Sequence, residues 1–189
     1  MAGMGSAAPK RATYQDVLNA PATMVAQLIH GTLVTSPRPA LRHARASSTL
    51  GEELGPPFNR GRGGPGGWLI LDEPEVHLGE HVLVPDLAGW KRERVPEFPD
   101  EAFMTLAPDW VCEVLSPSTE ALDRADKLPI YAEHRVAHVW LIDPQVQTLE
   151  VFKLDGPSYR LLKTWSADAR VRAEPFDAIE LDLALLWQR

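Results

Sequence analysis

Two apolar stretches of the sequence each contain a carboxylate, a group that is costly to bury. Glu113 lies inside the run WVCEVLS, and Asp86 follows Pro85 in HVLVPDLAGW. An ionised carboxylate in a protein interior is paired, hydrogen-bonded or bound to a cation. Each acid could therefore bond a nearby backbone N–H or an arginine. Taken together with a backbone carbonyl, that of Val114, the two carboxylates form an oxygen site that suits Mg²⁺ or Mn²⁺.

A lysine follows the Glu113 segment on the next predicted element. Proline is tolerated only in the first turn of a helix, so Pro129 predicts a helix that begins near Asp126 as N-cap and ends near His134. Lys127 then lies in the first turn, close to Glu113 if the connecting loop folds back. A divalent metal there can polarise a phosphate and activate a water, and a lysine can stabilise the negative charge that develops. A solvated surface lysine is the alternative.

These residues need a scaffold, and the hydrophobic pattern of the chain predicts one. Strand alternation places Val111, Glu113 and Leu115 on one face of a strand at 110–115, and 138–143 is an apolar run of the kind buried on both faces. The other predicted elements are a short helix at 13–19, two strands within 24–36 that turn at His30-Gly31, a helix at 38–54, a loop at 59–67, a strand at 68–71, a hairpin of 75–78 and 81–87 that turns at Gly79-Glu80, a strand pair at 148–154 and 159–165, and a closing helix within 179–187. This order indicates an α/β or α+β fold, a mixed sheet with helices packed against it.

Length and composition fit one globular domain. The chain has 189 residues, of which 44% are hydrophobic, and we expect a domain at 13–189 behind a flexible tail at 1–12. No apolar run reaches about 18 residues, so no membrane span is expected. The single cysteine, Cys112, can form neither an internal disulfide nor a thiolate zinc site, which predicts a reduced, cytoplasmic protein with Cys112 as core filling. The net charge of −7 argues against a protein that coats nucleic acid with its whole surface.

Several segments together resemble a known family. They are VPDLAGW at 84–90, APDWVCEVLSPST at 107–119, the residues Asp123, Lys127 and Tyr131 that follow, and VAHVWLIDPQVQTLEVFKL at 136–154. These segments look like the Uma-type, restriction-endonuclease-like family of bacterial proteins, which belongs to the PD-(D/E)XK nuclease superfamily. The resemblance extends from about Gln27 to Trp187. It implies a restriction-endonuclease-like fold, which is a mixed β-sheet flanked by helices. It also implies an enzyme that hydrolyses DNA with Mg²⁺ or Mn²⁺.

The resemblance also implies a role for each acid. Asp86 matches the motif aspartate and Glu113 the second acid, so both, with the carbonyl of Val114, would hold the metal. The superfamily's lysine normally lies two residues after the second acid, where this chain has Leu115. In families of this type the lysine is thought to have moved to the following helix, which points to Lys127 as the third catalytic residue.

Other positions match the family less closely. The family usually has acidic residues in the first hairpin, where this chain has Gln27, His30 and Thr32. His43 and Glu75 fit further family positions and could line the site, although a surface histidine and a hairpin glutamate fit the sequence equally well. Three polar residues after the Glu113 strand are expected to shape the turn by capping backbone N–H groups: Ser116, Ser118 and Asp123.

Three groups of basic residues could contact DNA phosphates. They are Arg38, Arg42 and Arg45, spaced to share one face of the predicted helix, then Arg60 and Arg62 in the glycine-rich loop, and finally Lys91, Arg92 and Arg94 after the Asp86 segment. A solvated charged surface is the alternative for all three groups.

The sequence therefore leaves three functions to compare. The preferred hypothesis is a Mg²⁺-dependent DNA endonuclease that acts through Asp86, Glu113 and Lys127. The second is a nuclease-like fold without activity that serves as a binding or assembly module, favoured by the departures in the first hairpin and by the net acidity. The third is a hydrolase that uses Ser116 or Ser118 with a histidine, but the sequence has no G-x-S-x-G elbow. A homodimer, with 138–143 and its neighbours at the interface, is a further expectation.

Overall fold

The computed structural model describes residues 10–188 of the chain. Most of the expected N-terminal tail, 1–12, lies outside the described residues. Within the described part, Lys10 to Ala12 lead into a short helix α1 (Tyr14–Leu18), and the N–H of Ala12 donates to the carbonyl of Gly31 at 2.8 Å. The side chain of Asp16 accepts a hydrogen bond from the N–H of Thr13, and this contact caps the start of the helix.

A six-stranded sheet forms the centre of the molecule, with the order β10-β9-β8-β7-β6-β3. Its strands are β3 (Trp68–Asp72), β6 (Leu87–Lys91), β7 (Trp110–Val114), β8 (His138–Asp143), β9 (Thr148–Asp155) and β10 (Ser158–Ser166). Strands β7 and β8 run parallel, and the other neighbouring pairs are antiparallel. The predicted mixed sheet is therefore confirmed. Because β8 lies inside the sheet with its four central residues buried, this strand is not available as the surface of a dimer, contrary to the expectation for 138–143.

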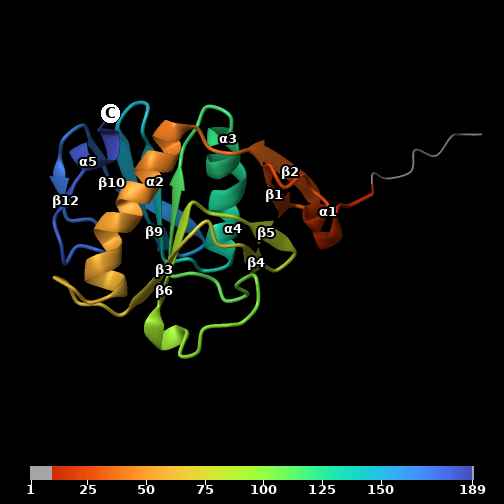
Figure 1. Cartoon of the computed structure of the whole chain (residues 1–189), viewed down its shortest axis with the longest axis horizontal. Coiled ribbons are helices and arrows are strands. Elements are labelled where there is room, and N and C mark those ends of the chain that lie inside the picture. The colour runs from red at the N-terminus through yellow and green to blue at the C-terminus, as the bar shows by residue number, and fades with distance from the viewer. Residues whose placement is uncertain (1–9, 189) are drawn as a thin grey trace, which may run out of the picture.

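Helices cover both faces of this sheet (Figure 1). On one face, α2 (Leu41–Leu54) and α5 (Ala184–Trp187) share a buried cluster with Cys112 and Val114 of β7. On the other face, α4 (Leu128–Glu133) packs against Val111 and Leu115. The predicted alternation along this strand is thus confirmed, and it turns the side chain of Glu113 toward the α4 layer. Cys112 is fully buried as core filling, and burial raises the pKa of its thiol.

A smaller sheet with the order β2-β1-β5-β4 lies beside the α4 layer. Its strands are β1 (Met24–Ile29), β2 (Thr32–Pro37), β4 (Val76–Leu78) and β5 (His81–Leu83). The predicted hairpin that turns at His30-Gly31 is present, with His30 and Gly31 both at positive φ. On one face of the small sheet, Leu28 and Val82 pack against Val17 of α1.

The second strand of the 75–87 hairpin is shorter than predicted. It ends at Leu83, so Asp86 does not lie on it but on the connection that leads into β6. Pro85 has no N–H to continue a ladder, and the N–H of Val84 bonds a side-chain oxygen of Gln27 instead of a neighbouring strand. The chain uses this break to cross from the small sheet to the central sheet.

The helix after β7 begins earlier than predicted. The helical stretch begins at Glu120 with α3 (Glu120–Leu122). The π-helix η3 (Asp123–Lys127) then joins α3 to α4. The prediction of a start near Asp126 is wrong because a π-turn precedes Pro129: the N–H of Leu128 bonds the carbonyl of Asp123, five residues earlier. The wider turn accommodates a proline that an uninterrupted α-helix would exclude from its interior. Lys127 therefore lies in the middle of a helical stretch.

The remaining elements differ from the predictions in small ways. The predicted helix at 38–54 begins at Leu41 because Pro39 precedes it, so Arg38 is not on the helix and does not share a face with Arg42. The other elements are the π-helix η1 (Gly55–Asn59), the 3-10 helix η2 (Arg92–Arg94), and a two-stranded sheet of β11 (Arg170–Val171) and β12 (Leu181–Asp182). The closing helix is accordingly limited to α5.

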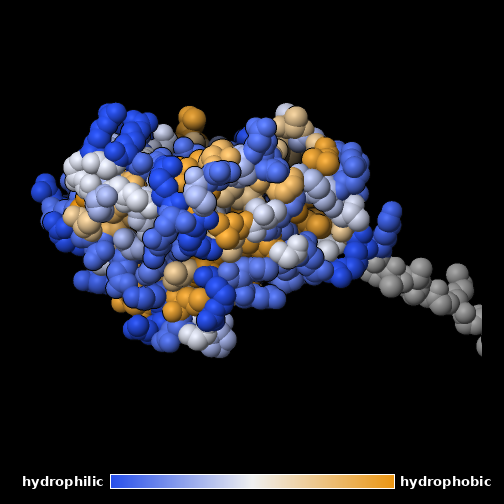
Figure 2. Space-filling view, turned by 90° about the horizontal axis from the view of Figure 1, so that it is seen from below, coloured by the Kyte–Doolittle hydropathy of each residue, from blue (hydrophilic) through white to orange (hydrophobic). Residues whose placement is uncertain are grey.

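The surface seen in Figure 2 is mainly hydrophilic, with apolar side chains dispersed among polar ones. No helix within residues 10–188 combines the length and the apolar character that crossing a membrane requires.

Candidate active site

Asp86 and Glu113, the two acids predicted to hold a metal, line one cavity of about 300 Å³ next to the carboxyl end of β7. In Figure 1 this is the upper part of the molecule, where the end of β7, the start of α2 and the start of α3 meet. The segments that line the cavity are β1, the connection from β2 into α2, the Val84–Asp86 crossing, the end of β7 with the turn that follows it, and the helical stretch η3.

Sheet register brings Asp86 to Glu113. Leu87 pairs with Cys112 across β6 and β7, so the next position outward places Asp86 opposite Glu113. The carboxylate of Asp86 accepts a hydrogen bond from the N–H of Val114 at 2.7 Å, and Nε2 of His43 lies 3.3 Å from the same oxygen. Asp86 is thereby fixed beside the Glu113–Val114 peptide.

The carboxylate of Glu113 is enclosed by donors from the helical stretch. Only 3% of its side chain is exposed. The hydroxyl of Tyr131 donates to Oε1 at 2.5 Å, and Nζ of Lys127 donates to Oε2 at 3.1 Å. Lys127 therefore reaches back from the helix to the strand, and the sequence-based alternative of a solvated surface lysine is wrong.

Lys127 contacts a second acid on its own helix. Its Nζ lies 2.9 Å from Oδ1 of Asp123, and both side chains are almost fully buried. Asp123, Lys127 and Tyr131 are spaced by four residues, which places them along one side of a helix. This spacing is visible in the sequence and could have identified Tyr131 as a contact of Glu113, a role that the sequence analysis did not assign.

The cluster holds more negative than positive charge. Burial raises the pKa of Glu113 to about 8, although the charge of Lys127 acts to lower it, and Asp123 and Asp86 add to the rise. Burial acts to lower the pKa of Lys127, but the charges of Glu113 and Asp123 outweigh it and raise that pKa, so the amine stays protonated. Burial likewise acts to lower the pKa of His43, and its hydrogen bond to Asp86 turns the net shift upward. A bound cation would offset the excess of carboxylates.

The oxygen donors at this point fit a hard divalent cation. Within residues 10–188, no three histidine, cysteine, aspartate or glutamate side chains are grouped so as to hold a metal ion by themselves. Asp86 and Glu113 supply two carboxylates, and the carbonyl of Val114 faces the side on which Asp86 lies, because the N–H and C=O of one strand residue point the same way. Mg²⁺ is commonly held by one or two carboxylates together with waters and substrate phosphates. The residues present match that requirement.

Comparison with known proteins places the chain in a family. Residues 12–185 match the model of the Uma2 family, which is described as "Putative restriction endonuclease". The chain belongs to the Uma2 family. A crystal structure of a "putative nuclease" from Anabaena variabilis is similar in fold, with a TM-score of 0.75 and 23% sequence identity over 93% of this chain and 97% of that one. At this identity the likeness shows the fold alone. No curated protein matches the sequence significantly.

The other polar residues predicted for the site divide into two groups. Ser116 and Asp123 line the cavity, and the hydroxyl of Ser116 lies within hydrogen-bond distance of those of Ser118 and Thr119, at 3.0 and 2.9 Å. Glu75 lies elsewhere.

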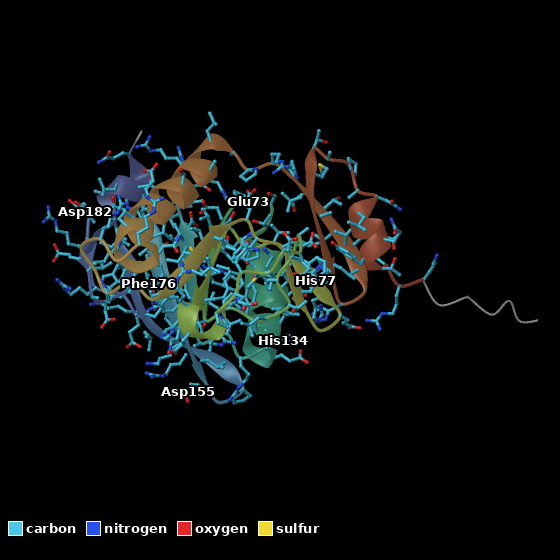
Figure 3. All side chains as sticks on the ribbon, turned by 60° about the horizontal axis from the view of Figure 1, so that its bottom comes forward. Glu73, His77, His134, Asp155, Phe176 and Asp182 are labelled. Carbon is cyan, nitrogen blue, oxygen red and sulfur yellow. The ribbon has the colours of Figure 1, made fainter. Side chains whose placement is uncertain are left out.

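The carboxylate of Glu75 accepts a hydrogen bond from the hydroxyl of Tyr14 at 2.7 Å and lies 2.7 Å from Nε2 of His77. Glu73, two residues earlier, lines the cavity instead and pairs with Arg38 at 3.6 Å. Figure 3 shows Glu73 below the segment that joins β2 to α2, and His77 beside the small sheet. Glu73 thus lines the cavity, whereas Glu75, two residues later, bonds Tyr14 and His77 outside it.

The basic residues predicted to contact DNA lie at two ends of the molecule. Arg38 lines the cavity, and Arg42 lies in the first turn of α2 near it. Lys91 is at the end of β6 remote from Asp86, and η2 and the glycine-rich loop are near it at the lower end of Figure 1. Several of the remote residues have structural partners: Arg94 pairs with Asp109 at 2.8 Å, and Arg92 donates to the carbonyl of Trp68 at 3.3 Å. Of the predicted basic residues, Arg38 is the one that lines the cavity with the acids.

Proposed function

We propose that this Uma2-family protein is a metal-dependent endonuclease that hydrolyses DNA phosphodiester bonds. One observation carries the proposal: two carboxylates from different segments, Asp86 and Glu113, converge in one cavity with the buried ammonium of Lys127. Membership of a family described as "Putative restriction endonuclease" supports the reaction class.

Asp86, Glu113 and the carbonyl of Val114 are the residues that would hold Mg²⁺ or Mn²⁺. When bound there, such an ion polarises a phosphate and lowers the pKa of a water. In hydrolysis the water oxygen forms a bond to phosphorus, the bond from phosphorus to the leaving sugar oxygen breaks, and that oxygen takes up a proton. The charge that develops on the phosphate oxygens needs a fixed positive partner.

Lys127 is suited to stabilise charge rather than to accept a proton. Its pKa is raised by the carboxylates on either side, so the amine carries its positive charge at neutral pH. Glu113 and Asp123 hold this ammonium from two directions. Tyr131 in turn fixes Glu113 through a hydrogen bond to its other oxygen. Tyr131 and Asp123 are therefore positioning residues, and Asp86, Glu113 and Lys127 are the proposed catalytic residues.

Plasmid nicking tests the proposal. The purified protein is incubated with supercoiled DNA and Mg²⁺ or Mn²⁺, beside Glu113→Gln and a matched control, Glu75→Gln. Glu75 is hydrogen-bonded like Glu113, but it is only half-buried and lies outside the cavity. We expect the wild type and Glu75→Gln to nick DNA and Glu113→Gln to lose at least a hundredfold in rate. Equal nicking by Glu113→Gln and the wild type would show that the activity does not come from this site.

The alternative function is an inactive binding or assembly module with a nuclease fold. The neutral side chain of Gln27 in the cavity is the observation that favours it. Titration with Mn²⁺ in a calorimeter separates the two functions. The endonuclease predicts binding that Asp86→Asn abolishes, whereas a module without a metal site predicts no heat at millimolar Mn²⁺.

A further inference from the structure

Gln27 is a buried polar residue at the cavity whose orientation is fixed by the backbone. It lies on β1 with 4% of its surface exposed. Alternation along this strand turns Val25 and Gln27 toward the cavity, while Ala26 and Leu28 pack on the other side near α1. Gln27 therefore faces the acids across the cavity from an element that the catalytic residues do not belong to.

The hydrogen bond to Val84 decides which end of the Gln27 amide faces the cavity. The N–H of Val84 donates to Oε1 of Gln27 at 3.0 Å. A backbone N–H can only donate, so the atom that it meets must be the amide oxygen. The NH₂ group is then the end left for the cavity, and it carries two donors and no acceptor.

This NH₂ group has no assigned partner among the neighbouring acids. The donors found for Asp86 are the N–H of Val114 and the ring of His43, and those found for Glu113 are Tyr131 and Lys127. Over residues 10–188, no hydrogen bond from Nε2 of Gln27 is found. Its oxygen already accepts from the N–H of Val84, and its free N–H donors suit an anion.

We propose that Gln27 is a substrate-binding residue whose NH₂ group donates to a non-bridging oxygen of the phosphate held in the cavity. The inference rests on the proposed function, since it places the phosphodiester between Gln27 on one side and the metal ligands on the other. Gln27 also anchors Val84, two residues before Asp86, so it couples the position of the phosphate to that of a metal ligand.

The substitution Gln27→Glu separates these two roles. A carboxylate of the same shape still accepts from the N–H of Val84, which preserves the anchor. Its second oxygen replaces the NH₂ group, so a donor becomes a negatively charged acceptor that repels a phosphate and adds a ligand for a cation. Gln27→Ala, by contrast, removes the anchor and the donor together. Glu75→Gln, outside the cavity, is the control for a change of one charge.

Binding of the dinucleotide pTpT in the presence of Ca²⁺, measured by calorimetry, tests the inference without cleavage. We expect Gln27→Glu to bind pTpT at least tenfold more weakly than the wild type, because a hydrogen bond to a charged acceptor is lost and a repulsive charge replaces it. Mn²⁺ affinity is measured on the same samples, and we expect Gln27→Glu to keep or increase it. Glu75→Gln should match the wild type in both titrations.

Three outcomes would overturn the inference. They are equal affinity of Gln27→Glu and the wild type for pTpT, a parallel loss of Mn²⁺ affinity in Gln27→Glu, and no binding of pTpT by the wild type. Failure of the proposed function looks different. If pTpT binding depends on Gln27 but plasmid DNA is not nicked, the inference holds and the endonuclease assignment does not.

Discussion

Replacement of Lys127 by methionine tests the central contact of the site. Methionine keeps much of the length of the side chain but removes the ammonium that lies 3.1 Å from Glu113 and 2.9 Å from Asp123. The Lys127 side chain is 5% exposed, and those of both acids are 3% exposed. Water therefore solvates only a small part of the carboxylates that the substitution leaves behind.

The expected loss of stability follows from this burial. Removing one partner of a buried ion pair lowers the free energy of unfolding by about 3–5 kcal/mol, because an uncompensated charge remains. Uptake of a proton by Glu113, whose pKa is already raised to about 8, relieves part of that charge, so we expect the lower end, about 3 kcal/mol. With a urea m-value of about 2 kcal/mol/M, this corresponds to a midpoint lowered by roughly 1.5 M.

The same substitution at Lys153 is the matched control. Lys153 pairs with Glu174 at 2.6 Å, but the two side chains are 43% and 44% exposed. Exposed pairs contribute about 0.2–1 kcal/mol, so Lys153→Met should shift the urea midpoint by roughly 0.5 M or less. Both variants are unfolded in urea at pH 7.5 with EDTA and followed by tryptophan fluorescence. If Lys127→Met loses no more stability than Lys153→Met, the ammonium of Lys127 does not lie in the buried acidic cluster, and its proposed role in catalysis loses its basis.

Three further substitutions test other parts of the structure. Tyr131→Phe removes the hydroxyl that donates to Glu113 and should lower the free energy of unfolding in urea by about 1.5–3 kcal/mol; a loss below about 0.5 kcal/mol would contradict the contact. Burial lowers the pKa of His81 in the folded chain, so as the pH falls this imidazole is protonated in the unfolded chain before it is protonated in the folded one. The free energy of unfolding of the wild type should therefore fall as the pH drops below about 6.5. His81→Asn should reduce the slope of the free energy of unfolding against pH by the equivalent of up to one bound proton. A slope between pH 7.5 and 5.5 that is the same in this variant and the wild type would refute the role of His81. Gly89→Ala places a Cβ 3.1 Å from Cε3 of Trp110 and should lower the melting temperature, because overpacking a core costs about 1–3 kcal/mol; an unchanged melting temperature would show that the ring yields freely.

The sequence by itself determined which residues we propose as the carriers of the chemistry. Glu113 and Asp86 are marked by their apolar surroundings, since a carboxylate in such a run requires a partner. Alternation along β7 correctly placed Glu113 on the face opposite Cys112. The four-residue spacing of Asp123, Lys127 and Tyr131 also encodes one side of the helix, from which Lys127 and Tyr131 reach the strand and Asp123 reaches Lys127. These are local properties, because the side-chain period of a strand or helix is fixed by its backbone.

The boundaries of two elements differ from those that the local pattern predicts, because hydrogen bonds outside that pattern decide them. Pro129 predicts a helix start, yet the π-turn of η3 accommodates the proline and lengthens the helix toward the strand. The hairpin strand predicted to reach Leu87 ends at Leu83, where the side chain of Gln27 takes the N–H of Val84. Gln27 is 57 positions away from Val84, and the bond from Leu128 to Asp123, although local, departs from the α-helical spacing that the prediction assumes.

Only the tertiary structure decided what meets at the site. The pairing of Leu87 with Cys112 brings Asp86 opposite Glu113, although 27 positions of sequence separate them. The crossing between the two sheets selects Glu73 for the cavity and leaves Glu75 with Tyr14. The length of β6 carries Lys91 to the end of the sheet remote from the acids. Register and strand order are set by the whole core at once, so residue types and spacing indicate candidate groups for the site but do not fix the distances between them.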